Sequence, residues 1–148
     1  MIPKLLATPR ILLVDDEPQG LWLRAQVMKL YGFPVVTADG PIEAISLMTK
    51  AAGRIDLAIL DYDMPGMNGC DLPDQLRAIC PRVKIILYSG AIDIPDNEMT
   101  SVDAFVSKDE GTSRLLAQII QLAQIRTRVP PSVLTDTELC FRANSAQY

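Results

Sequence analysis

The sequence predicts one α/β domain built on a five-stranded parallel sheet with helices on both faces. Short apolar runs of strand length alternate along the 148 residues with helix-length segments that are apolar on one side. Most of these runs end in a polar or charged residue followed by turn-forming residues, as expected where buried parallel strands leave a sheet. Right-handed crossovers then bring the carboxyl ends of all strands to one edge.

The first half of the chain contains three predicted strands and two predicted helices. The strands are residues 10–14, 33–37 and 55–60, and the second lies nearer an edge because Pro34 cannot donate to a ladder. The first helix starts at Pro18 and stops at Gly32, and the second runs from Pro41 to about Ala52. The apolar stripe of the first helix is formed by Leu21, Ala25 and Met28 and widened by Trp22, Leu23, Val27, Leu30 and Tyr31.

The second half adds two strands and two clear helices. A helix follows Gly69 and runs to about Cys80, and residues 83–88 form a strand that delivers Ser89. Residues 91–101 are weak as a helix because Pro95 interrupts them, which predicts one or two turns at most. A short strand at 104–106 and a helix at 112–126 complete the domain.

Composition and charge limit the classes of protein to consider. Hydrophobic residues make up 49% of the chain and charged residues 22%, as in an ordinary soluble domain. The net charge of −4 argues against direct nucleic-acid binding, and no apolar run reaches the roughly 18 residues of a membrane span. The N-terminus is a poor signal peptide, and the three cysteines lack metal-site spacing, which predicts reduced thiols in a cytoplasmic protein. The absence of histidine removes the usual general base.

The stretch after the third strand is the strongest sign of function. Residues 61–69 read DYDMPGMNG, so a buried strand ends directly on Asp61. Open α/β folds place their ligand sites at the carboxyl ends of strands. Asp61 alone fits a cap on the following turn equally well. The other strands add polar residues to the same edge: Asp15 and Asp16 from the first, Ser89 from the fourth and Lys108 from the fifth.

These side chains together have the chemistry of a phosphoryl-transfer site. Two carboxylates at about 4 Å repel by about 4 kcal/mol at an effective dielectric of about 20, and a divalent cation removes that cost. All-oxygen ligands favour Mg²⁺. Lys108 supplies a positive charge for phosphoryl oxygens and Ser89 supplies a hydroxyl donor. Without an activated serine, cysteine or histidine, a carboxylate is the expected covalent acceptor, and Asp61 on the central strand is best placed to form an aspartyl phosphate.

With these motifs the chain resembles the receiver domains of response regulators in two-component signalling, the CheY-like family. The resemblance covers roughly residues 9–126 and rests on DDE at 15–17, D-x-x-M-P-G-M-N-G at 61–69, Ser89 after an apolar strand and Lys108 after AFVS. It implies a flavodoxin-like fold of the receiver type, with a short or irregular fourth helix. Residues 1–8 are then an N-terminal extension and residues 127–148 a C-terminal tail.

The resemblance implies a role for each of these residues. Asp61 would accept a phosphoryl group from a phosphohistidine on a sensor histidine kinase or phosphotransfer protein. The Mg²⁺ ligands would be Asp15, Asp16, Asp61 and the backbone carbonyl of Asp63. Lys108 and Ser89 would contact the phosphoryl group. Phe105 would be the aromatic switch residue, although an aromatic residue in a short strand is also typical of a core.

The resemblance also implies how the protein would act. It would be a phosphoacceptor regulator rather than an enzyme, limited to self-catalysed phosphotransfer and dephosphorylation. No helix-turn-helix and no catalytic module follow residue 126, so we expect a stand-alone receiver, or a fragment of a larger protein. Its output would pass through protein–protein contacts with a downstream partner that the sequence does not name, and homodimerisation is one option.

Two departures from the family pattern keep alternatives open. Asp109 follows Lys108 where the family usually has proline, and the segment after Ser89 is short. These departures leave room for a receiver-like interaction module that is never phosphorylated. A second alternative is a haloacid-dehalogenase-like phosphatase, because Asp61 and Asp63 form a D-x-D pattern. That motif normally follows the first strand, whereas Asp61 follows the third.

Overall fold

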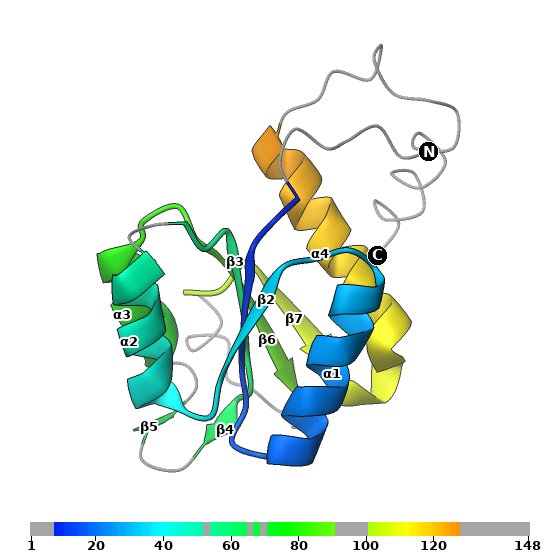
Figure 1. Ribbon diagram of the computed structural model, residues 1–148, viewed down its shortest axis with the longest axis horizontal. Helices are drawn as coiled ribbons and strands as arrows, with labels where there is room; N and C mark the ends of the chain where they lie inside the picture. Colours follow the sequence, from blue (N-terminus) through cyan, green and yellow to red (C-terminus); the bar gives the residue numbers. More distant parts are fainter. Residues whose placement is uncertain (1–7, 52–53, 65–66, 69–70, 91–100, 128–148) are drawn as a thin grey trace.

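Five parallel strands form one sheet in the order β2-β1-β3-β6-β7 (Figure 1). The computed structural model describes residues 8–51, 54–64, 67–68, 71–90 and 101–127. The strands of the sheet are β1 (Ile11–Val14), β2 (Val35–Ala38), β3 (Leu57–Leu60), β6 (Lys84–Ser89) and β7 (Ala104–Ser107). The predicted fold class is confirmed: β3 is central, and β2, which follows Pro34, lies at an edge as expected.

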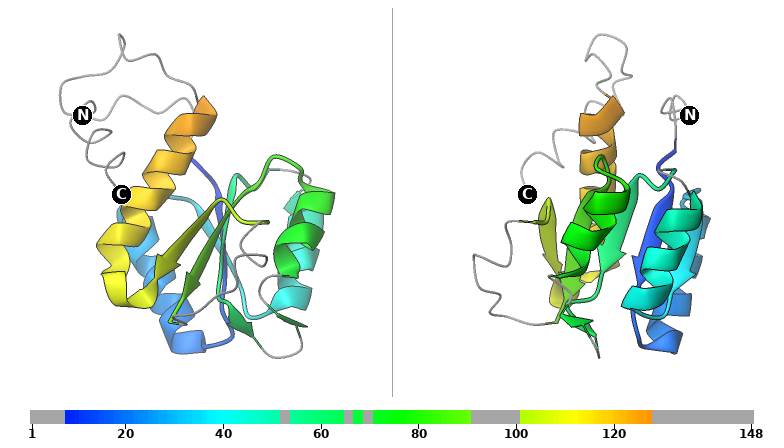
Figure 2. Two further views of the ribbon diagram at one scale, coloured as in Figure 1. Left: turned by 180° about the vertical axis from the view of Figure 1, so that it is seen from behind. Right: turned by 90° about the vertical axis from the view of Figure 1, so that its left-hand side faces the viewer.

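Helices cover both faces of this sheet (Figures 1 and 2). They are α1 (Pro18–Leu30), α2 (Pro41–Ala51), α3 (Leu72–Ile79) and α4 (Gly111–Thr127). Figure 2 shows α2 and α3 together on one face, with α1 and α4 on the other. Pro18 occupies the first turn of α1, where its missing N–H leaves no bond unmade. Gly32 follows the end of α1 with φ of +88°, a left-handed conformation that favours glycine.

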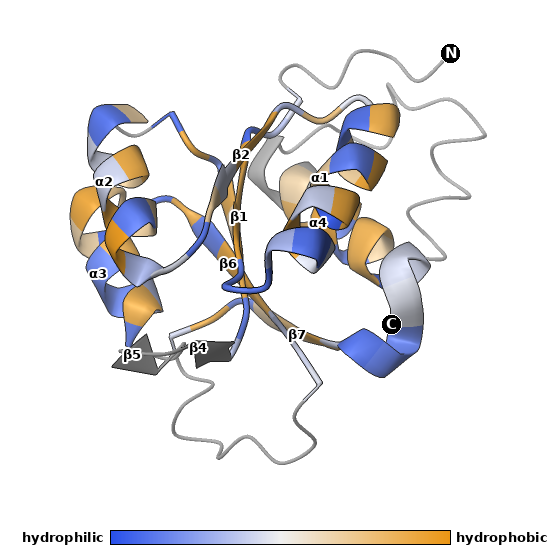
Figure 3. Cartoon of the chain, turned by 60° about the horizontal axis from the view of Figure 1, so that its bottom comes forward, coloured by the Kyte–Doolittle hydropathy of each residue, from blue (hydrophilic) through white to orange (hydrophobic). Residues whose placement is uncertain are grey.

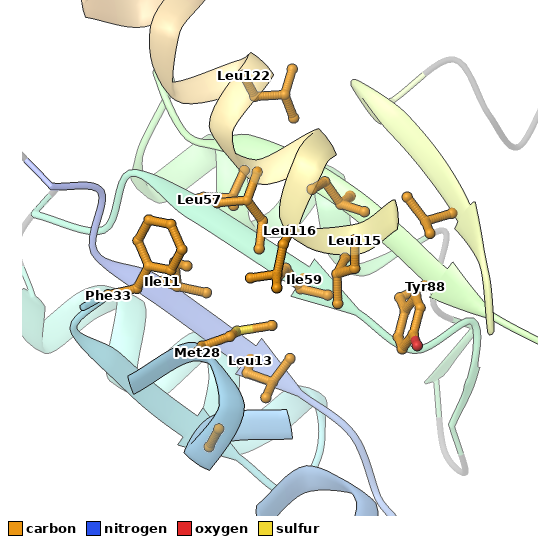
Figure 4. Packing of buried hydrophobic residues seen from close by; sticks show 14 of the residues in the cluster. Ile11, Leu13, Met28, Phe33, Leu57, Ile59, Tyr88, Leu115, Leu116 and Leu122 are labelled. Atoms are coloured by element: carbon orange, nitrogen blue, oxygen red, sulfur yellow. The ribbon is translucent and has the colours of Figure 1, made fainter. Parts of the chain in front are cut away.

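The sheet separates two hydrophobic cores. Because side chains alternate along a strand, Leu12 and Val14 pack under α2 and α3, whereas Ile11 and Leu13 pack under α1 and α4. Figure 4 shows the second core, and the hydropathy colouring of Figure 3 shows apolar residues along the strands and mixed faces on the helices. Burial on both faces explains why the sequence of β3, LAIL, is continuously apolar.

Four apolar residues in α1 or at its C-terminal cap lie outside the core, against the prediction: Trp22, Leu23, Leu30 and Tyr31. Trp22 was expected in the core or at its flank, yet it is 63% exposed, and Leu30 is 85% exposed. Leu21, Ala25 and Met28, spaced by three or four residues, face the sheet. A residue one position later is rotated by about 100°, so it leaves the buried stripe.

Three short elements were not predicted. β4 (Asp63–Met64) and β5 (Met67–Asn68) pair antiparallel after the central strand, and a 3₁₀ turn, η2 (Lys108–Glu110), joins β7 to α4. The predicted fourth-helix turns at 91–101 lie outside the described residues except for residue 101, which is a turn. Most of the predicted N-terminal extension and C-terminal tail also lie outside them.

Candidate functional site

The register of β1 and β3 places Asp15 and Asp61 side by side. Val14 pairs with Leu60, the last residues of β1 and β3, so Asp15 and Asp61 follow adjacent strand ends. The N–H of Asp61 donates to the carbonyl of Val14 at 3.0 Å, and the N–H of Asp15 donates to the carbonyl of Ala38 at 3.1 Å. These bonds extend the sheet by one residue and fix both aspartates at its carboxyl edge.

Three carboxylates meet at this edge. Asp15, Asp16 and Asp61 each offer an oxygen, and these three oxygens all lie within 4.8 Å of one another. Asp15 is 2% exposed and Asp61 is 9% exposed, whereas Asp16 is open to solvent. Hard oxygen ligands on a site with one open side suit Mg²⁺, which binds through a few carboxylates and keeps several waters. The residues present therefore fit this cation.

Lys108 faces the same carboxylates from the end of β7. Its Nζ lies 3.7 Å from Oδ1 of Asp61 and 3.9 Å from Oδ2 of Asp15, and its side chain is 34% exposed. The lysine is thus near enough to balance the two buried carboxylates and still reaches solvent. The sequence prediction that Lys108 joins the acidic edge agrees with this position.

Arg24 is a second cation at the site, and the sequence reasoning missed it. Its Nη2 forms an ion pair with Oδ2 of Asp15. Its guanidinium carbon lies 5.4 Å from the centre of the Tyr88 ring, and Nζ of Lys108 lies 6.0 Å from the same centre. Both distances allow cation–π attraction. The sequence did contain one sign of this second cation. Arg24 directly precedes Ala25, so a charged residue adjoins the apolar stripe of a predicted helix.

Burial changes the proton affinity of this cation and of its aromatic neighbour. It lowers the pKa of the Arg24 guanidinium, while Tyr88 and Asp61 act in the opposite direction. Burial also raises the pKa of the Tyr88 hydroxyl, and the positive charge of Arg24 lowers it by a smaller amount. Arginine nevertheless stays protonated in proteins, so Arg24 carries a full charge beside Asp15.

Ser89 and Phe105 lie on the neighbouring strands. Ser89 is the last residue of β6, is fully buried, and pairs in register with Ser107, the residue before Lys108. Phe105 pairs with Leu87, and it packs half-buried against the core under α2 and α3. The register thus brings Ser89 close to the base of the lysine, while Phe105 lies two residues earlier on β7.

The turn after Lys108 is built without proline. The Ser107 hydroxyl accepts the N–H of Asp109 at 3.2 Å, and Oε1 of Glu110 accepts the N–H of Ser107 at 3.4 Å. These reciprocal bonds form a capping box at the start of η2. Asp109 is exposed, and every peptide bond among the described residues is trans. The remaining predicted ligand, Asp63, lies in β4 two residues after Asp61.

A family model and several curated proteins match this chain. The family model of the response regulator receiver domain matches residues 11–120. The sensor protein GacS of Pseudomonas syringae pv. syringae is 36% identical over 76% of this chain and 13% of its own length. The chain spans less than half the length of the curated relatives it matches first.

Solved structures share the same architecture. A CheY-like response regulator receiver domain protein from Methanospirillum hungatei superposes with a TM-score of 0.76 at 23% identity, over 82% of this chain and 98% of its own. The response regulator protein TrrA from Thermotoga maritima, solved with Mg²⁺ and BeF, gives 0.68 at 30% identity, over 77% and 98%. TrrA in complex with histidine kinase ThkA gives 0.69 at 30% identity, over 77% and 97%.

No helix in the described part of the chain combines the length and the apolar character needed to cross a bilayer.

Proposed function

Because this chain belongs to the response regulator receiver domain family of two-component signalling, we propose that it is a Mg²⁺-dependent switch in which Asp61 accepts a phosphoryl group. The observation that carries this proposal is the meeting of Asp15, Asp16 and Asp61 with Lys108 at one edge of the sheet. A buried carboxylate with a cation on one side and open access on the other suits an acceptor of phosphoryl groups.

Each residue of the site would have its own role in phosphotransfer. One oxygen of Asp61 would form a bond to phosphorus as the bond between phosphorus and the donor nitrogen breaks. Asp15 and Asp16, with the backbone carbonyl of Asp63, would hold Mg²⁺ beside Asp61. When bound, Mg²⁺ would neutralise charge on the phosphoryl oxygens. Lys108 would pair with those oxygens, because its Nζ is already 3.7 Å from Asp61.

The phosphorylated and unphosphorylated forms would then differ in structure. Ser89 would turn its hydroxyl to the phosphoryl oxygens, and Phe105, half-buried on the neighbouring strand β7, would follow as the switch residue. A complete shift between two states needs about 5.5 kcal/mol of differential binding, so several charge-assisted contacts must act together. Only contacts that differ between the states can drive the shift.

We propose a histidine kinase or a phosphotransfer protein as the phosphoryl donor. The complex between the relative TrrA and histidine kinase ThkA supports this choice. We further propose that residues 9–126 form the receiver unit, that it signals by binding a partner protein, and that it works in the cytoplasm. The thiol of Cys80 is buried, and its Sγ donates to the carbonyl of Ile55 at 3.6 Å. As a phosphoacceptor regulator, the chain would catalyse only its own phosphorylation and dephosphorylation.

The first experiment is intact-mass analysis after incubation with acetyl phosphate and Mg²⁺. The parent protein should gain the mass of one phosphoryl group, and the gain should disappear in Asp61→Asn and without Mg²⁺. Asp74→Asn, which removes an exposed carboxylate on α3, is the matched control and should be phosphorylated like the parent. No mass gain at any donor concentration would favour an unphosphorylated interaction module. Hydrolysis of phosphomonoesters that is lost in Asp63→Asn would favour a phosphatase.

A further inference from the structure

Both carboxylate oxygens of Asp15 are already occupied within the chain. Oδ1 accepts the backbone N–H of Glu17 at 2.9 Å. Oδ2 accepts from Nη2 of Arg24 and lies 3.9 Å from Nζ of Lys108. A metal ion that approaches Asp15 therefore meets a carboxylate whose Oδ2 already faces two positive charges.

A glycine in the first turns of α1 makes this arrangement possible. Side chains of a helix point toward its N-terminus, so Arg24 extends over the residue four positions earlier, which is Gly20. A Cβ atom at residue 20 would lie 3.2 Å from Nη1 of Arg24 and 2.6 Å from Oε2 of Glu17. Glycine is a poor helix former, and at this position it leaves space for both side-chain ends.

The guanidinium of Arg24 also lies near an aromatic ring and is largely removed from solvent. It lies 5.4 Å from the centre of the Tyr88 ring, and Tyr88 belongs to the buried core between α1 and α4 (Figure 4). Its Nε is buried and has no hydrogen-bond partner within the described part of the chain. Arg24 is therefore desolvated, and the ion pair with Asp15 compensates only part of that cost.

From this geometry we propose that Arg24 is an internal counter-cation of the acidic site that competes with Mg²⁺ for Asp15. It neutralises Asp15 while the metal is absent, and it must give up its bond to Oδ2 before that oxygen can serve the metal directly or through water. The inference rests on the metal site of the proposed function and deepens it. It makes Arg24 a positioning residue that sets how much Mg²⁺ the switch needs.

The test is calorimetric titration of Mg²⁺ into the full chain, with no phosphoryl donor present. In Arg24→Met the dissociation constant for Mg²⁺ should fall by roughly tenfold, because one repelling charge is removed from a partly buried site. Arg24→Lys keeps the charge and should stay close to the parent. Lys29→Met removes one exposed charge from the last turn of the same helix and is the matched control. It should leave the Mg²⁺ affinity unchanged.

Gly20→Ala tests the same idea without removing a charge. A Cβ at residue 20 would lie 3.2 Å from Nη1 of Arg24 and 2.6 Å from Oε2 of Glu17, so both side-chain ends must shift. If the shift of Arg24 weakens its pairing with Asp15, the dissociation constant for Mg²⁺ should fall, by about twofold. The double variant with Arg24→Met should bind Mg²⁺ no more tightly than Arg24→Met alone, because both changes act through one contact. Alanine favours the helix, so this variant carries the test if Arg24→Met does not fold.

The outcomes separate this inference from the proposed function. Mg²⁺ binding that is equal or weaker in Arg24→Met and Gly20→Ala overturns the role of Arg24 and leaves the metal site standing. No Mg²⁺ binding in the parent or in any variant overturns both the metal site and the competition. Tighter binding in both variants, with Lys29→Met unchanged, establishes Arg24 as the competing cation.

Discussion

At the scale of single residues, the site is a set of carboxylates surrounded by cations and an aromatic ring. Arg24 and Lys108 both lie within about 6 Å of the centre of the Tyr88 ring, a range in which cations are attracted to aromatic faces. Tyr88 therefore contributes to the hydrophobic core and to the electrostatics of the site. Burial raises the pKa of the Tyr88 hydroxyl, so burial favours its neutral form.

Tyr88 gives the fold a specific dependence on pH. Because the pKa of Tyr88 is raised in the folded protein, the folded chain keeps this proton to a higher pH than the unfolded chain. The resulting stability is complete below about pH 10, the pKa of an unfolded tyrosine, and is lost as the pH rises through the folded pKa. Urea unfolding at about pH 9 and about pH 11 should show a smaller loss of stability in Tyr88→Phe than in the parent. Equal losses in the two proteins would contradict this role.

Most of the site could be predicted from the sequence because strand ends converge by topology. Asp15, Asp61 and Lys108 follow strands, so knowing the strands was enough to bring them to one edge. Arg24 belongs to a helix, and its contact with Asp15 depends on the rotation of α1 about its axis and on the space above Gly20. The pattern of apolar residues shows which side of α1 is buried. It does not fix the rotation of the helix or the space above Gly20 closely enough to predict one ion pair.

At the scale of elements, the turn η2 is held by side-chain hydrogen bonds and contains no proline after Lys108. The capping box of Ser107 and Glu110 satisfies backbone N–H groups and sets the direction of the chain into α4. It also fixes the backbone of Lys108, the first residue of the turn. The turn could not be predicted from periodicity because it contains only three residues, and the same holds for the hairpin of β4 and β5.

Removal of this cap should destabilise the protein measurably. Ser107→Ala deletes the acceptor for the N–H of Asp109, and the loss of such a cap typically costs about 1 kcal/mol of folding free energy. The matched control is Ser113→Ala, which changes an exposed serine inside α4. Thermal and urea unfolding should place Ser113→Ala near the parent and Ser107→Ala below it. Identical stabilities for the two variants would show that the cap is energetically unimportant.

At the scale of the whole molecule, one sheet serves two separate cores. The parallel sheet and its burial on both faces were predicted because short apolar runs alternating with helices leave few other topologies. The outward turn of Trp22 and Leu30 was not predicted, because an apolar residue costs little at a surface and the sequence alone does not exclude it there.

The two cores provide a matched pair of buried methionines. Met28 on α1 and Met48 on α2 are both fully buried, one on each face of the sheet. Met28→Ala and Met48→Ala should each lower the free energy of unfolding by about 2–5 kcal/mol, because each leaves a cavity. The double variant should equal the sum within about 0.5 kcal/mol, since the side chains share no partner across the sheet. Two separate transitions in urea, or a strong departure from additivity, would mean that the faces do not unfold as one unit.

The exposed position of Trp22 has a spectroscopic consequence. It is the only tryptophan of the chain, and it lies on the outer side of α1, two residues from Arg24. Its fluorescence should therefore have the long-wavelength emission of a hydrated indole, be open to quenching by iodide, and change little when the protein unfolds. Circular dichroism is then the better probe of folding, and tryptophan emission becomes an optical label for whatever covers the surface of α1.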